Sequence, residues 1–199
     1  MYLSKVWINW HWAKDPYQLH RAIWQLFPGR PDDQRDFLFR VEDLQPGRGA
    51  AVLLQSQQAP ESAEVASVLA SKDYALPLAQ GVRLRFRLRG NPIKSIKDER
   101  QRRNAKGEIK SCRVPLIHEE EQLQWLARKL ETGAQLETAR VVDEQPLYFR
   151  KSDMPGKIKP VCFEGILVVN DVEQFKGLIE RGVGPAKAMG CGMLSIAPA

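Results

Sequence analysis

The sequence predicts an α+β fold, in which short strands and amphipathic helices alternate. Apolar residues make up 43% of the 199 residues and charged residues 27%, which is typical of a globular protein with a buried core. Residues 82–89 (V-R-L-R-F-R-L-R) alternate strictly between apolar residues and arginine, which indicates a strand with two different faces. Asp15 and Pro16 stand before an apolar stripe with helical spacing, which indicates the start of a helix.

The first half of the chain contains the elements of one βαββαβ unit. Residues 2–10 are rich in β-branched and aromatic residues and predict the first strand. The helix that begins after Asp15 is expected to end at P-G-R-P, residues 28–31. The remaining elements are predicted strands at 36–42 and 50–56, a helix at 60–71 and a strand at 82–89. This order is that of the ferredoxin-like (RRM-like) fold.

The second half shows a similar alternation and predicts a second αβ unit. The segment from Gly90 to Arg113 is basic and poorly patterned, which fits a hairpin or a loop. After it we expect a helix at 118–132, strands at 136–142, 146–150 and 158–169, a helix capped by Asp171, and a last strand at 193–196. The predicted domains are therefore residues 1–90 and residues 91–199.

Positive charge is concentrated in one segment. Between Gly81 and Arg113 the chain has twelve Lys/Arg and three Asp/Glu, a local balance of +9. Because the whole chain carries +6, the remaining residues sum to −3. A basic surface of this kind favours a polyanion such as RNA or DNA, although a solvated strand face is the alternative.

A glycine-rich loop precedes the last strand and carries one lysine, Lys187. It reads R-G-V-G-P-A-K-A-M-G-C-G, with glycines at Gly182, Gly184, Gly190 and Gly192. Glycine allows positive φ and close backbone approach, which suits contact with an extended phosphate chain. The alternative is a helix C-cap followed by a turn. A Walker A loop and a dinucleotide fingerprint are both excluded, because no lysine follows Gly190 and Lys187 stands where a third glycine is needed.

The sequence predicts no metal site and no cofactor. None of the three histidines His11, His20 and His118 forms a pair at metal-ligand spacing. The acidic cluster D-D-Q-R-D, from Asp32 to Asp36, is the one candidate for Mg²⁺, and a solvated turn is its alternative.

The cysteines and the chain start indicate a cytoplasmic protein with no membrane partner. Cys112, Cys162 and Cys191 are far apart and lack C-x-x-C spacing, as expected of free thiols in a reducing compartment. The N-terminus lacks the pattern of a signal peptide, and no apolar run is long enough for a membrane span.

RNA can be cut without a metal because its own 2′-hydroxyl serves as the nucleophile. A histidine suits the proton transfers, since its ordinary pKa lies near neutral. Tyr17 and His20 lie one helical turn apart and could reach one phosphate together. A lone helical histidine is more often a packed or surface residue, so this alternative stays open.

Several ordered motifs resemble the CRISPR-associated repeat-processing endoribonucleases. They are D-P-Y-Q-L-H at 15–20, R-F-R-L-R-G-N-P-I-K at 85–94, C-R-V-P-L at 112–116, F-E-G at 163–165 and G-x-G-P-x-K-x-x-G-x-G from Gly182. The sequence is most similar to the CasE family, the RNA-cutting subunit of the subtype I-E Cascade complex.

The resemblance implies a fold, an activity and partners. The fold would be two tandem ferredoxin-like domains, the first of which carries a catalytic helix with His20 and Tyr17. The activity would be a metal-independent endoribonuclease that cuts precursor crRNA at the 3′ base of the repeat hairpin. The product would carry a 2′,3′-cyclic or 3′ phosphate and stay bound. The partners would be CRISPR repeat RNA and other Cascade subunits.

The basic segment is expected to run along the RNA stem, since A-form RNA is recognised by shape and phosphates. The predicted RNA-binding residues are Lys94, Lys97, Arg100, Arg102, Arg103, Lys106, Lys110 and Arg113, with Lys157, Lys159 and Lys187 as further phosphate contacts. The arginines of residues 82–89 could add to the same surface. Two alternatives remain: a non-catalytic RNA-hairpin-binding subunit, and a metal-dependent nuclease that uses the cluster Asp32 to Asp36.

Overall fold

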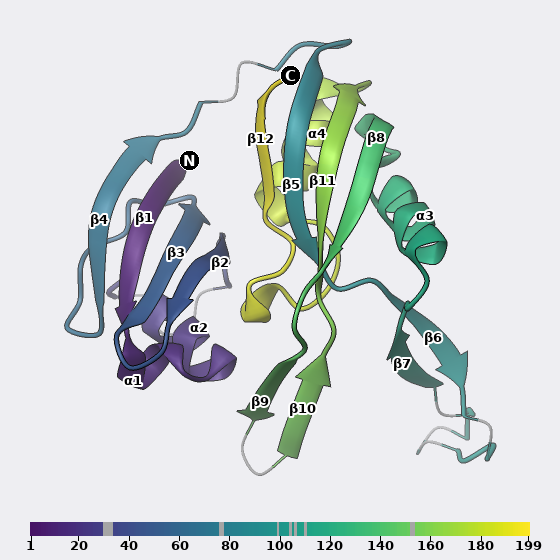
Figure 1. The fold of residues 1–199 in the computed structure, drawn as a ribbon, viewed down its shortest axis with the longest axis horizontal. Helices are drawn as coiled ribbons and strands as arrows, with labels where there is room; N and C mark the ends of the chain where they lie inside the picture. The colour runs from purple at the N-terminus through teal and green to yellow at the C-terminus, as the bar shows by residue number, and fades with distance from the viewer. Residues whose placement is uncertain are drawn as a thin grey trace.

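Two four-stranded antiparallel sheets lie side by side, and helices pack on each (Figure 1). The structure is a computed structural model, and it describes residues 1–29, 34–75, 78–98, 100–103, 105, 107–109, 111–151 and 154–199. The fold class is therefore confirmed as α+β with tandem ferredoxin-like units.

The first unit has the sheet order β2-β3-β1-β4. Its elements are β1 (Tyr2–Asn9), α1 (Trp10–Ala13), α2 (Pro16–Trp24), β2 (Phe37–Gln45), β3 (Gly49–Ser56) and β4 (Ala66–Asp73). Apolar side chains of α2, such as Leu19 and Ile23, pack against Phe39 and Leu54 of the sheet in one buried core. The predicted first strand, first helix and both middle strands are confirmed.

The predicted helix at 60–71 is wrong, because these residues contribute to the edge strand β4. Val65, Val68 and Leu69 have helical spacing, which explains the prediction. In the structure β4 pairs with β1, from Tyr2 opposite Asp73 to Ile8 opposite Ala66. Pairing with β4 gives hydrogen-bond partners to the backbone groups along one edge of β1. This tertiary contact outweighs the helical preference of residues 60–71.

The second unit has the sheet order β12-β5-β11-β8. Its elements are β5 (Arg83–Gly90), α3 (Glu119–Leu130), β8 (Ala134–Asp143), β11 (Val161–Val169), α4 (Val172–Arg181) and β12 (Leu194–Pro198). Two hairpins project from it: β6 (Ile93–Lys97) with β7 (Ser111–Pro115), and β9 (Leu147–Lys151) with β10 (Met154–Ile158) (Figure 1). The hairpin expected within residues 90–113 is therefore present.

The strand predicted at 82–89 is present as β5, but it belongs to the second sheet. It pairs with β11 and β12, and its apolar face (Leu84, Phe86 and Leu88) lies in the second core. The chain passes from one sheet to the other between β4 and β5, so a division at residue 90 assigns β5 to the wrong unit. Alternation identifies a strand but does not say which sheet it joins.

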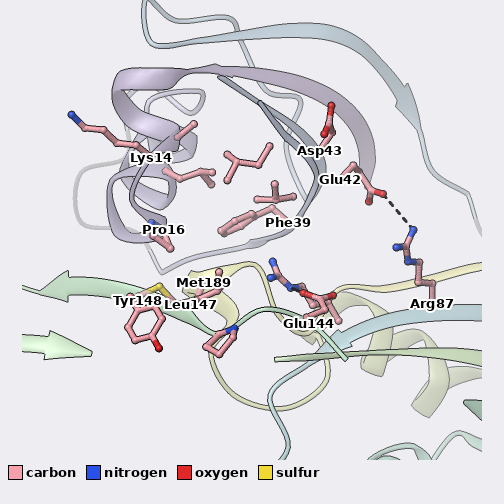
Figure 2. A pocket seen from close by; sticks show the side chains of 16 residues that line it. Lys14, Pro16, Phe39, Glu42, Asp43, Arg87, Glu144, Leu147, Tyr148 and Met189 are labelled. Atoms are coloured by element: carbon pink, nitrogen blue, oxygen red, sulfur yellow. Dashed lines mark ion pairs between the residues drawn. The ribbon is translucent and has the colours of Figure 1, made fainter. Parts of the chain in front are cut away.

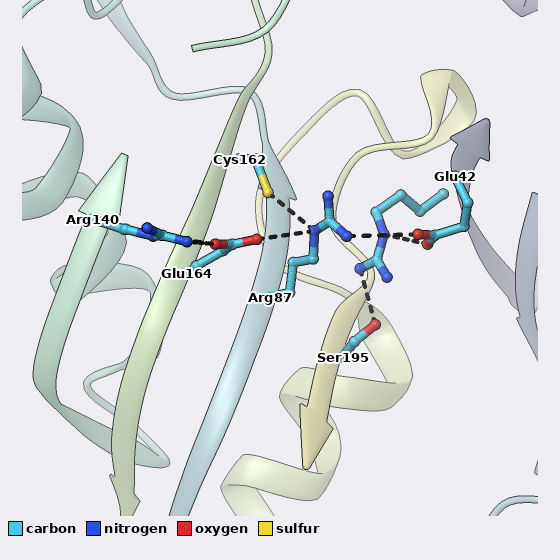
Figure 3. Close-up of polar contacts among 7 residues, drawn as sticks. Glu42, Arg87, Arg140, Cys162, Glu164 and Ser195 are labelled. Carbon is cyan, nitrogen blue, oxygen red and sulfur yellow. Dashed lines mark hydrogen bonds and ion pairs between the residues drawn. The ribbon is translucent and has the colours of Figure 1, made fainter. Parts of the chain in front are cut away.

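A row of alternating charges joins the two units (Figure 3). Arg40 of β2 is buried; its Nε lies 2.7 Å from Glu42 Oε1, and its Nη1 donates to Ser195 Oγ of β12 at 2.9 Å. Glu42 also lies 3.7 Å from Arg87, and Glu164 pairs with both Arg87 and Arg140. Across the same junction, Gln55 Nε2 donates to the carbonyl of Ile179 at 2.9 Å, in a buried position. Buried and directional contacts of this kind fix the orientation of the units.

In the described part of the chain, no helix combines the length and the apolar character that a membrane span requires.

Candidate functional site

Helix α2 carries the predicted catalytic pair. Asp15 caps it, because the Asp15 carboxylate accepts hydrogen bonds from the backbone nitrogens of Tyr17 (2.8 Å) and Gln18 (3.0 Å). Pro16 occupies the first helical position. Tyr17 and His20 are three residues apart in this helix and therefore lie on the same side of it.

His20 sits in an aromatic environment at the edge of the first core. Its ring centroid lies 6.4 Å from that of Trp24, 5.8 Å from Phe37 and 6.3 Å from Phe39. Its Nε2 is buried and has no hydrogen-bond partner among the residues that the structure describes. Burial, assisted by the charge of Arg35, lowers the pKa of His20 from 6.5 to about 4. His20 is therefore neutral at pH 7.

This lowered pKa predicts a pH-dependent loss of stability. The unfolded chain takes up a proton at His20 below about pH 6.5, whereas the folded chain resists it down to about pH 4. The stability that the neutral, buried His20 ring contributes is thus complete above pH 6.5. It is lost as the pH falls from there through about 4, the pKa of His20 in the folded protein. Since His20 is partly exposed, we expect the loss to be about 1–3 kcal/mol.

Urea unfolding at pH 7.5 and pH 5.0 checks this prediction, with His20→Asn as the comparison. Other groups titrate in both proteins, so the relevant quantity is the difference between them. The wild type should lose more stability than the variant on acidification. Equal losses in the two proteins would show that His20 has no lowered pKa.

The glycine-rich loop fits tightly between the two units. All four of its glycines have positive φ, between 76° and 94°. A Cβ at Gly182 would lie 2.7 Å from Leu38 of β2, and one at Gly190 would lie 3.2 Å from Phe39. The loop thus packs against the ring that neighbours His20. Lys187, in the 3-10 helix η1 (Lys187–Met189), donates from Nζ to the carbonyl of Arg181 at 2.5 Å.

Substitution of Gly184 should reveal how tightly the loop is packed. A Cβ there would lie 2.7 Å from the Trp125 ring, at a backbone φ of +78°. Gly47 has the same φ of +78°, but nothing lies within 4 Å of its Cβ position. We expect Gly184→Ala to cost about 2–5 kcal/mol, from backbone strain plus overpacking. Gly47→Ala should cost about 1–2 kcal/mol, from strain alone. If urea unfolding gave similar losses of stability for Gly184→Ala and Gly47→Ala, this account would be contradicted.

One cavity lies between the start of α2, β2 and the β9–β10 hairpin (Figure 2). Its volume is about 480 Å³. Pro16, Phe39, Leu147, Tyr148 and Met189 supply apolar surface, while Glu42, Asp43, Glu144, Arg87 and Arg89 supply charge. The cavity therefore adjoins the N-terminal end of the helix that carries Tyr17 and His20.

A second cavity brings together predicted RNA-binding residues from distant parts of the chain. Its volume is about 530 Å³, and Arg113, Lys157 and Lys159 line it. The glycine-rich loop forms another wall, through Pro185, Ala186, Ala188 and Met189. Met189 lines both cavities, so the cationic surface and the surface beside α2 meet at this loop.

The β6–β7 hairpin divides its basic residues between two faces. Ser95 lies opposite Arg113 and Lys97 opposite Ser111, which places Lys97 and Arg113 on the same face. Lys94 lies on the other face, where its Nζ is 2.9 Å from Glu121 of α3. Lys97 and Arg113 are therefore better placed for a ligand at the second cavity than Lys94.

Three further predicted RNA-binding residues, Arg100, Arg102 and Arg103, follow the end of β6. Arg102 pairs with Asp98 at 2.5 Å, and Arg103 donates to the carbonyl of Gly107. Arg100 is exposed. Lys106 and Lys110 lie outside the described residues, as do Asp32 and Asp33 of the acidic cluster.

The arginines of β5 are engaged within the protein. Arg83 pairs with Glu137, Arg87 with Glu42 and Glu164, and Arg89 with Glu144, while Arg85 donates to the carbonyl of Pro198. They therefore have partners within the protein and do not form a free basic surface.

The charge of Arg35 acts on His20, although the two residues are far apart in the sequence. The segment D-D-Q-R-D stands out in the sequence for its carboxylates, so the sequence gives no signal that its arginine lies near His20.

Among the residues that the structure describes, no three His, Cys, Asp or Glu side chains gather as a group that could hold a metal ion.

The chain is similar to CRISPR-associated proteins along its whole length. The family model described as CRISPR associated protein matches residues 1–198. The chain is 52% identical to the CRISPR system Cascade subunit CasE of Escherichia coli, over all of both chains. It is 34% identical to the CRISPR-associated endoribonuclease Cse3 of Thermus thermophilus, over 92% of this chain and 90% of that protein.

Two solved structures extend the similarity to the whole fold. The crystal structure of Cas6e from Escherichia coli has a TM-score of 0.88 and 50% identity, with complete coverage of both chains. Cse3 bound to a 19-nucleotide RNA has a TM-score of 0.80 and 31% identity, also with complete coverage. The chain therefore belongs to the CRISPR-associated protein family that these relatives represent.

Proposed function

We propose that this protein is a metal-independent endoribonuclease that binds the hairpin of CRISPR repeat RNA and cleaves precursor crRNA at the 3′ base of the stem. One observation carries the proposal: helix α2, which carries Tyr17 and His20, lines one cavity through Pro16 and Leu19, and this cavity meets a second, cationic one at Met189 of the glycine-rich loop. The cations of the second cavity are Arg113, Lys157 and Lys159. Relatives named as a Cascade subunit and as an endoribonuclease support it.

The reaction requires two proton movements around one phosphate. The 2′-hydroxyl loses its proton and attacks phosphorus, the bond from phosphorus to the 5′-oxygen breaks, and that oxygen gains a proton. The product is a 2′,3′-cyclic phosphate, which water can open to a 3′ phosphate. His20 can remove the first proton as a base, which requires that its pKa rise toward the ordinary value when RNA binds, and the Tyr17 hydroxyl can donate a hydrogen bond to a phosphate oxygen.

His20 must become accessible for this role. Its Nε2 is buried in the structure, so the ring or the chain over it has to shift when RNA binds. Catalytic hydrogen bonds are often incomplete in the free enzyme and form only with substrate. The absence of a protein partner for Nε2 within the described residues leaves this atom available to RNA after such a shift.

The RNA stem would lie across the cationic residues. Lys97 and Arg113 on one face of the β6–β7 hairpin, with Lys157 and Lys159, would contact phosphates along the stem. The same contacts would retain the cleaved hairpin, as expected of a subunit that stays with its product in a Cascade complex in the cytoplasm.

Cleavage of a synthetic repeat hairpin in EDTA tests the proposal. We expect one cut at the 3′ base of the stem, with the hairpin product still bound. A non-catalytic RNA-binding subunit would bind the hairpin without cutting it in any buffer. Cutting that requires Mg²⁺ would instead favour a metal-dependent nuclease.

A further inference from the structure

Tyr148 is an exposed aromatic residue that the proposed reaction does not use. It is 65% exposed, more than any other large hydrophobic side chain among the described residues. Aromatic side chains of this size usually contribute to cores or binding surfaces, because their burial gains much apolar area. Because it lies beside a cavity, this exposed tyrosine is accessible to a ligand bound there.

The β9–β10 hairpin holds Tyr148 next to a cation. Tyr148 lies opposite Lys157 in the strand register, and the Lys157 Nζ is 5.2 Å from the centre of the Tyr148 ring. A Cβ on Gly156 would lie 2.3 Å from the ring of Phe149, so that ring lies directly against the glycine backbone. The Phe149 ring therefore packs on one face of the hairpin. Tyr148 is the next residue in the strand, so its side chain points to the opposite face.

The position of Tyr148 connects it to the proposed active site. It lines the cavity at the start of α2, together with Leu147, Met189 and Pro16 (Figure 2). Lys157, its strand partner, lines the other, cationic cavity. Tyr148 therefore stands between a surface suited to phosphates and the helix that carries Tyr17 and His20.

We propose that Tyr148 stacks on the base of an unpaired nucleotide that flanks the RNA stem, while Lys157 contacts a neighbouring phosphate. This inference rests on the proposed function. An exposed ring beside a lysine offers the two interactions by which single-stranded RNA is bound: stacking on the π-face of a base and attraction to its phosphate. Such a contact tolerates different bases and would hold the strand in place next to α2.

The test compares two RNAs: a blunt repeat hairpin, and the same hairpin with short single-stranded extensions. We expect Tyr148→Ala to weaken binding of the extended RNA about tenfold and to leave the blunt hairpin unaffected. Tyr148→Phe, which keeps the ring, should bind both RNAs like the wild type. Abasic nucleotides in the extension should give the wild type and Tyr148→Ala equal affinities for the extended RNA, because the base on which Tyr148 stacks is then missing.

Leu69→Ala is the matched control, because Leu69 is 63% exposed on the distant strand β4. Equal affinities of wild type and Tyr148→Ala for the extended RNA would overturn the inference. It would also be overturned if Tyr148→Ala lost the same affinity for the blunt hairpin as for the extended RNA. The proposed function fails separately: in that case the wild type itself would neither bind nor cut either hairpin.

Discussion

His20→Ala is expected to slow RNA cleavage severely while it leaves hairpin binding close to that of the wild type. General acid–base catalysis by a positioned side chain contributes about 10²- to 10⁴-fold to a rate, and the loss should fall in this range. Binding should persist because the cations at the second cavity, Arg113, Lys157 and Lys159, are untouched. Single-turnover cleavage and equilibrium binding on the same hairpin separate the two effects.

Two controls make this result interpretable. His11→Ala removes an exposed histidine from the neighbouring helix α1 and should cut RNA at the wild-type rate. His20→Asn replaces the packed ring with a smaller polar group that cannot titrate near neutral pH, so it should also be inactive. Its melting temperature shows whether the fold survives. Activity within severalfold of the wild type in a folded His20→Asn protein would remove His20 from the mechanism.

The sequence predicted those parts of the fold that depend on local pattern. Asp15 and Asp171 both cap helices as expected, since capping needs only neighbouring backbone nitrogens. The arginine alternation predicted strand β5 for a similar reason. By contrast, residues 66–73 have a weak pattern and form β4 only because β1 offers a partner. No local signal could supply that contact.

In the candidate site, too, the sequence predicts local structure but not tertiary contacts. Y-x-x-H predicted the helix position of Tyr17 and His20, but Phe37 and Phe39, which surround His20, come from a strand later in the chain. These two rings bury His20, and burial is the main cause of its lowered pKa. The spacing of residues in the sequence cannot show this contact. The arginines of β5 similarly meet carboxylates from β2, β8 and β11, so their engagement depends on tertiary structure.

The glycine-rich loop illustrates why one pattern can have two explanations. The sequence suggested contact with phosphate or a turn between elements. In the structure three of the glycines lie against side chains of both units, so close protein packing alone requires glycine there. The loop also lines the cationic cavity, so the packing holds a wall of the proposed RNA site in position.

A single 2′-deoxy sugar just upstream of the cleaved phosphate should stop the reaction altogether. In the proposed mechanism the 2′-oxygen is the nucleophile, so its removal leaves the phosphate with no attacking group. Binding should be unchanged, because the stem phosphates that the cations contact are still present. The effect should exceed that of His20→Ala, since a missing nucleophile cannot be partly replaced by water acting as a base.

The most direct measurement is therefore cleavage of matched all-ribose and 2′-deoxy hairpins by the wild-type protein in EDTA. We predict that the all-ribose RNA is cut at the 3′ base of the stem and gives a 2′,3′-cyclic or 3′ phosphate, while the 2′-deoxy RNA is bound intact. Cleavage of the 2′-deoxy RNA, or cleavage of either RNA only after Mg²⁺ is added, would contradict the account.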